Sequence, residues 1–164
     1  MTFRFRSMLM AVAAATLLCL APVADTGAKT ANDRSYEYYE DALRLFSIQD
    51  YRAALIQLKN ALQQDHRNLS ARVLLGKTYL RLGDGAAAER QLTFARSTGA
   101  DDTLILVPYG RSLLLQGKHR KLLEEILPAN RPPDIESEIR FLRGQAHLDQ
   151  RQPRPGAHRL SGCP

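Results

Sequence analysis

Small residues return every 34 positions along this chain, and that period constrains the fold more than any single motif does. The clearest column is Ala42, Gly76, Gly110 and Gly144. Three further columns keep the same step: Ala54, Ala88 and Leu122; Ala61, Ala95 and Ala129; and Leu58, Leu92 and Ile126. Four columns in register indicate an internal repeat, in which each unit is one supersecondary structure that stacks on the next.

Each unit divides into two amphipathic stretches with a short break between them. In the first unit, apolar residues recur at helical spacing over residues 36–48 and again over 51–63. The break falls at Gln49-Asp50, and one and two periods later at Gly83-Asp84 and Gly117-Lys118. Later stretches are expected over 69–82, 85–97, 103–116, 119–127 and 135–148. The pattern predicts an all-α fold, an α-solenoid of about three and a half stacked helix-turn-helix units.

The small residues have a physical reason in such a fold. Two helices whose axes lie about 8–10 Å apart need small side chains at the point of closest approach. A glycine inside a helix costs about 1 kcal/mol relative to alanine, so glycines at one repeated phase indicate a packing role. The packing positions predicted in this way are Ala42, Ala54, Ala61, Gly76, Ala88, Ala95, Gly110 and Gly144.

The stretch LLGKTYLRLGDGAAAERQLTFA, residues 74–95, resembles the tetratricopeptide repeat, a 34-residue helix-turn-helix unit. The resemblance rests on Leu75, Gly76, Tyr79, Ala88, Leu92 and Ala95, and in the preceding unit on Ala42, Leu45, Ala54, Leu58 and Ala61. The chain departs from the family pattern by having no Trp, by Leu122 at a small-residue position, and by Pro108 inside a first helix. An interior proline costs about 3 kcal/mol unless the helix kinks or restarts, so we expect the third unit to be the least regular.

A narrower resemblance extends from residue 1 to about residue 149. A leader followed by YYEDALRLFSIQDYRAALIQLKNALQQD and LVPYGRSLLLQGKHRKLLEEI is similar to the N-terminal part of exported TPR proteins of PEP-CTERM/exosortase systems. That family is associated with exopolysaccharide export and is usually classed as lipoprotein. Its members are long arrays, whereas this sequence stops inside a fourth unit.

Residues 1–28 have the pattern of a secretory signal peptide. Arg4 and Arg6 precede an uncharged run from Met8 to Ala21, which is short for a membrane span and fits a signal core. An uncleaved N-terminal anchor is the alternative. Leu18 precedes Cys19, and this bulky residue disfavours lipidation. We therefore expect a periplasmic protein, associated with a membrane only if Cys19 is lipidated or the signal stays uncleaved.

The net charge of +6 lies mostly at the two ends of the chain. Residues 1–28 contribute +1 and residues 150–164 contribute +3, which leaves +2 for the repeats. This distribution gives little reason to expect nucleic-acid binding.

The repeat units are expected at 35–68, 69–102 and 103–136, with a partial unit at 137–149. Residues 150–164 do not continue the pattern, because Pro153 and Pro155 prevent a second helix. Three interpretations stay open for this tail: a short basic binding segment, a disordered end, and out-of-frame translation of a longer repeat protein, which we favour. The corresponding alternative functions are a basic module for polyanions or membrane surfaces, and a truncated fragment without function.

The sequence contains no catalytic, cofactor or metal constellation that we can identify. Its histidines, His66, His119, His147 and His158, lie in different units and in the tail, without a second ligand at metal spacing. No phosphate-binding loop is present. We therefore expect no enzyme activity and no cofactor.

Binding is the function that remains, and in stacks of this family the first helices line a concave groove. The helical phase places Tyr39, Phe46, Lys77, Arg81 and Arg111 toward that groove. The three cations predict a basic strip edged by apolar residues, suited to a protein or peptide partner with acidic groups. The alternative is a solvated charged face without a ligand.

Overall fold

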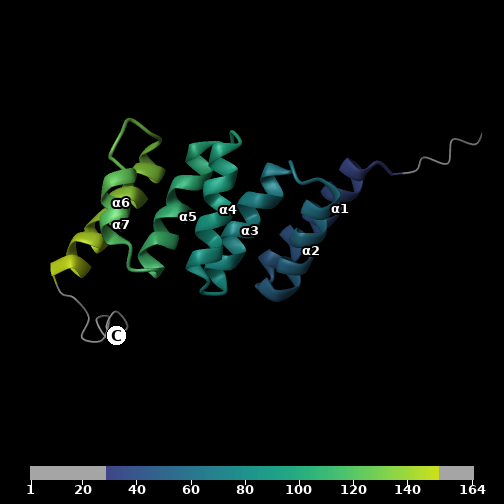
Figure 1. Ribbon diagram of the computed structural model, residues 1–164, viewed down its shortest axis with the longest axis horizontal. Helices are drawn as coiled ribbons and strands as arrows, with labels where there is room; N and C mark the ends of the chain where they lie inside the picture. The colour runs from purple at the N-terminus through teal and green to yellow at the C-terminus, as the bar shows by residue number, and fades with distance from the viewer. Residues whose placement is uncertain (1–28, 152–164) are drawn as a thin grey trace, which may run out of the picture.

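The computed structural model describes residues 29–151, and this part of the chain folds into seven α-helices without strands. The helices are α1 (Ala31–Ser47), α2 (Tyr51–Gln64), α3 (Leu69–Arg81), α4 (Gly85–Ser97), α5 (Asp102–Leu115), α6 (His119–Glu125) and α7 (Pro133–Arg151). They follow one another along the long axis, from α1 and α2 at one end to α6 and α7 at the other (Figure 1). Helices α1/α2, α3/α4 and α5/α6 form hairpins, and α7 packs on α5 and α6. The predicted all-α solenoid of stacked helical hairpins is confirmed.

The turn inside each hairpin has the same backbone geometry in all three units. Its central residue takes a left-handed conformation, with φ of 64° at Gln49, 80° at Gly83 and 68° at Gly117. The next residue in the first two units is an aspartate that caps the second helix: Asp50 accepts from the amide of Ala53 (3.0 Å), as Asp84 does from Ala87 (2.8 Å). Such a cap satisfies one of the amides that a helix start leaves unpaired.

The helix boundaries differ from the predicted ones most clearly in α1, α6 and α7. Helix α1 begins at Ala31 rather than at residue 36, because Thr30 and Asp33 form a reciprocal capping box. Helix α6 ends at Glu125 rather than at residue 127, because Pro128 pushes the residue before it out of the helical conformation. Helix α7 extends to Arg151, so residues 150 and 151, which we assigned to the tail, are helical. The predicted signal peptide and the rest of the tail lie outside the described residues.

Two of the predicted glycine positions, Gly76 and Gly110, lie at close contacts between helices. A Cβ added to Gly76 of α3 would lie 2.6 Å from Cγ of Leu92 on α4. A Cβ added to Gly110 of α5 would lie 3.1 Å from Cδ1 of Ile126, after α6, and 2.9 Å from Cδ1 of Leu142 on α7. The alanines of the same set are completely buried: Ala42, Ala54, Ala61, Ala88 and Ala95.

Two members of the small-residue columns lie elsewhere. Ala129, in the same column as Ala61 and Ala95, is exposed in the loop between α6 and α7, because α6 has already ended before Pro128. Gly144 is exposed on α7, and an added Cβ would meet nothing within 4 Å. In earlier units this position is covered by the second helix of the unit, and the residues after Arg151 are not described. A packing role for Gly144 therefore stays a prediction.

The third unit has the shortest second helix of the three hairpins. Helix α6 has 7 residues, compared with 14 in α2 and 13 in α4. Helix α5 runs through Pro108, which is buried within it. We expected Pro108 to make the third unit irregular, but α5 continues through it. The irregular element is the short α6, which ends before Pro128.

No helix among residues 29–151 combines the length and the apolar character that a membrane crossing requires.

The two glycines at one repeat phase should respond oppositely to alanine. We expect Gly76→Ala to lower the free energy of unfolding by about 1–2 kcal/mol, because the overpacking against buried Leu92 exceeds the gain in helix propensity. Gly144→Ala should raise it by about 1 kcal/mol, because the new methyl group meets open space. Urea denaturation of both variants measures the difference. Stabilisation by Gly76→Ala would contradict the proposed crossing.

Candidate binding groove

The first helices of successive units line one continuous groove. Its walls come from α3, α5 and α7, with Phe46 of α1 at one end, and its volume is about 1260 Å³. A concave surface formed by the first helices is the place where a helical solenoid presents an extended binding face.

The apolar lining follows the repeat period. One ladder consists of four residues in steps of 34: Phe46, Leu80, Leu114 and Leu148. Val107 and Phe141, seven residues before Leu114 and Leu148 on α5 and α7, also line the groove and are one period apart. Several lining side chains are strongly exposed, including Leu115 at 56% and Phe141 at 63%. Contiguous exposed apolar surface of this kind marks interaction sites in soluble proteins.

Two cations on α3 face this apolar lining without a partner. Neither Lys77 nor Arg81 forms an ion pair or a hydrogen bond with any other residue in the range 29–151. Lys77 is half-buried, and burial lowers the pKa of its ammonium group because the charged form loses solvation. An anionic group placed beside Lys77 would restore part of that lost stabilisation.

The groove is not the basic strip that we predicted. Helix α7 brings three carboxylates into the lining, so three basic residues face three acidic ones: Lys77, Arg81 and Arg111 against Asp134, Glu138 and Asp149. Arg111 is already paired, since its Nη2 lies 2.7 Å from Oε2 of Glu138. The physical reason is the contribution of α7, whose charges we had not included in the groove. A preference for acidic partners therefore stays a prediction without support from the net charge of the lining.

The predicted groove residues divide into two groups. Phe46, Lys77, Arg81 and Arg111 all line the groove. Tyr39 is not part of the lining, and its half-buried ring packs against the core cluster around Ala42 and Leu58. The lining residues of α7 were missed. The signal that could have found them was the repeat itself, since Phe141, Gln145 and Leu148 lie one period after Val107, Arg111 and Leu114.

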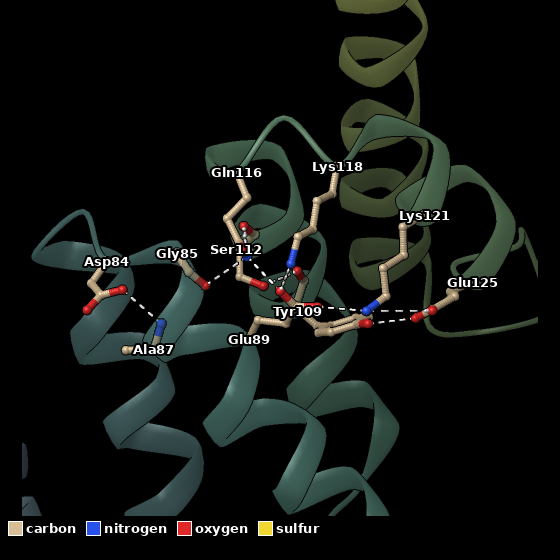
Figure 2. A network of polar contacts seen from close by, with 10 residues as sticks. All are labelled: Asp84, Gly85, Ala87, Glu89, Tyr109, Ser112, Gln116, Lys118, Lys121 and Glu125. Atoms are coloured by element: carbon tan, nitrogen blue, oxygen red, sulfur yellow. Dashed lines mark hydrogen bonds and ion pairs between the residues drawn. The ribbon is translucent and has the colours of Figure 1, made fainter. Parts of the chain in front are cut away.

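A polar network outside the groove fixes the second unit to the third (Figure 2). Glu89 of α4 accepts hydrogen bonds from Nζ of Lys118 (2.6 Å), Nζ of Lys121 (2.7 Å) and Nε2 of Gln116 (2.8 Å). Gln116 also donates to the backbone carbonyl of Gly85 (3.0 Å). These bonds join α4 to the end of α5 and the start of α6, and so hold one groove wall in place.

The network extends to a second carboxylate. The hydroxyl of Tyr109 donates to Oε2 of Glu125 (2.6 Å), and Nζ of Lys121 lies 3.9 Å from the other oxygen of Glu125. Burial raises the pKa of Tyr109, and the bond to Glu125 adds to this. Every charged group in the network has a partner, which indicates a structural role rather than a binding site.

Among residues 29–151, no cluster of three or more His, Cys, Asp or Glu side chains could hold a metal ion. Asp149, in the groove, is 4.0 Å from Nδ1 of His119. This pair lacks the further ligands that a metal site needs.

Comparison with known proteins supports a tetratricopeptide repeat protein. The family model described as tetratricopeptide repeat matches residues 45–106, which run from the end of α1 into α5 and make up less than half of the chain. Proteins with this repeat commonly mediate protein–protein interactions, and the all-helical fold is typically a non-catalytic scaffold. Neither a curated protein nor a solved structure matches the chain significantly.

The Glu89 network makes stability depend on pH. Burial opposes ionisation of Glu89, but the bonds from Lys118, Lys121 and Gln116 outweigh it and lower the carboxyl pKa from 4.5 to about 2. Because the pKa of the folded state lies below that of the unfolded state, the stabilisation is complete above pH 4.5 and is lost as the pH falls toward 2. We expect Glu89→Gln to cost about 1–2 kcal/mol at pH 7.

Thermal melts of both proteins at pH 7 and pH 3 would measure this effect. The melting temperature of Glu89→Gln should lie below that of the wild type at pH 7, and this difference in melting temperature should be smaller at pH 3. Glu124→Gln is a matched control, because Glu124 is exposed and its partner Arg120 lies 3.7 Å away in a surface pair. An equal loss in both variants would contradict the role assigned to Glu89.

Proposed function

We propose that this protein is an exported, non-catalytic scaffold that binds a peptide segment of a partner protein in the groove of its first helices. The observation that carries the proposal is the apolar lining of the groove, in which Leu115, Phe141 and Leu148 are exposed, with unpaired Lys77 and Arg81 beside it. Groups that stay exposed and unpaired in the isolated chain are those that gain most when a partner covers them.

The cellular setting is part of the same proposal. Residues 1–28 support export, since Arg4 and Arg6 precede an uncharged run in the manner of a signal peptide. The resemblance to PEP-CTERM/exosortase TPR proteins supports a place in exopolysaccharide or envelope export. The alternative of a basic polyanion-binding tail rests on residues beyond Arg151, and nothing among the described residues favours it.

Binding in the groove can be tested with two matched double variants. Leu115→Glu/Phe141→Glu places charges on exposed groove residues, and Ile56→Glu/Leu127→Glu does so at residues of similar exposure (60% and 58%) outside it. Peptides selected from a random phage-displayed library on the wild-type protein should bind the groove variant at least about tenfold more weakly, equivalent to about 1.4 kcal/mol. The control variant should bind as the wild type does. Equal weakening in both variants would contradict binding in the groove.

Export can be tested with a reporter that is active only in an oxidising compartment. Alkaline phosphatase, which needs disulfides, should be active when fused to the C-terminus of the full chain in a bacterial host. The same fusion without residues 1–28 should be inactive. Activity in both fusions, or in neither at equal expression, would contradict export by this segment.

A further inference from the structure

The charges of the groove are ordered along the stack of helices. Residues 34 positions apart occupy equivalent places on successive first helices. Where such a set includes charged residues, its charge becomes more negative from α3 to α7. One phase reads Lys77, Arg111, Gln145, and another reads Arg81, Leu115, Asp149. A third begins with Leu104 of α5 and continues with Glu138 of α7. The lining is therefore neutral in total but cationic at α3 and anionic at α7.

This gradient lies across the helices and not along them. Lys77 and Arg81, one turn apart on α3, have the same sign, and the charged lining residues of α7 are all acidic. A ligand that lay along one first helix would meet a single sign of charge. A ligand that crosses α3, α5 and α7 in turn meets both signs.

The charges at the two ends are accessible to a ligand. The side chains of Lys77 and Arg81 have no partner within residues 29–151, and neither has the carboxylate of Asp134 at the start of α7, whereas Asp149 lies 4.0 Å from Nδ1 of His119. The central pair, Arg111 and Glu138, is half-exposed on both sides. Exposed pairs of this kind contribute about 0–1 kcal/mol, so a ligand can replace them at little cost.

We propose that the groove binds a peptide segment with opposite charges at its two ends, acidic residues against α3, apolar residues against α5 and basic residues against α7. This inference rests on the proposed function and specifies its partner. Adjacent helix axes about 8–10 Å apart put α7 about 16–20 Å from α3, a distance that about five or six extended residues cover. The apolar centre faces Val107, Leu114 and Leu115.

Three synthetic peptides of equal length and with the same apolar centre test the proposal. One has aspartates at one end and lysines at the other, one has aspartates at both ends, and one has lysines at both ends. Fluorescence anisotropy with the full chain should give about tenfold tighter binding of the mixed peptide than of either other peptide. Lys77→Glu/Arg81→Glu should reverse this order in favour of the peptide with lysines at both ends, because both walls of the groove are then anionic.

Two controls separate charge recognition from general effects. Arg52→Glu/Lys59→Glu makes the same change in net charge at exposed residues of α2 outside the groove, and it should leave the order of the peptides unchanged. If the double variant fails to fold, Arg81→Glu alone can be used, because Arg81 is exposed. This single variant should weaken the preference for the peptide with opposite charges at its ends.

The outcomes distinguish this inference from the function on which it rests. Equal binding of all three peptides, lost in Leu115→Glu/Phe141→Glu, would leave the groove as a binding site and overturn the charge order. Tightest binding of the peptide with aspartates at both ends would also overturn it and would favour an acidic partner. Absence of binding by all three peptides and by any library-selected peptide would overturn both proposals.

Discussion

Contact between Leu92 and the backbone at Gly76 sets the geometry on which the rest of the molecule depends. Leu92 is completely buried, and no side chain fits between it and the first helix of its unit. Gly110 and Ile126 are separated along the chain by the same number of residues as Gly76 and Leu92, and they are also in close contact. Ala42 and Leu58 have this separation too, and both belong to one core cluster. Because the crossing is repeated, each first helix presents the same phase to the groove, and residues 34 positions apart become neighbours on one surface.

Because residues one period apart become neighbours on one surface, the features that depend on the period could be predicted from the sequence. Phe46, Lys77, Arg81 and Arg111 were placed in the groove by phase alone, because the crossing fixes the orientation of each first helix. Tyr39 and Phe46 both lie on α1 and pack against the same core cluster, but only Phe46 is part of the groove lining, a difference that the repeat phase does not contain. The end of α6 depended on a local effect, the restriction that Pro128 imposes on its neighbour, which the period does not contain.

The electrostatic character of the groove was the largest departure from expectation, and it came from α7. This helix buries Ile139, Leu142 and Ala146 against the third unit, as first helices of earlier units do. Arg143 donates to the carbonyls of Leu123 (2.7 Å) and Ile126 (2.8 Å), where the chain leaves α6. The partial fourth unit therefore supplies one complete wall of the groove, with its carboxylates.

Comparison of the two groups of charges separates structural from functional electrostatics in this fold. Glu89 is 12% exposed and accepts three hydrogen bonds, so removal of any partner leaves a poorly solvated carboxylate, and the network holds the units in place. Lys77 and Arg81 have the opposite properties: they contribute no bond to the fold and sit beside exposed apolar surface. The satisfied pairs of the Glu89 network therefore hold neighbouring units together, whereas Lys77 and Arg81 can change without the loss of any bond within the described residues.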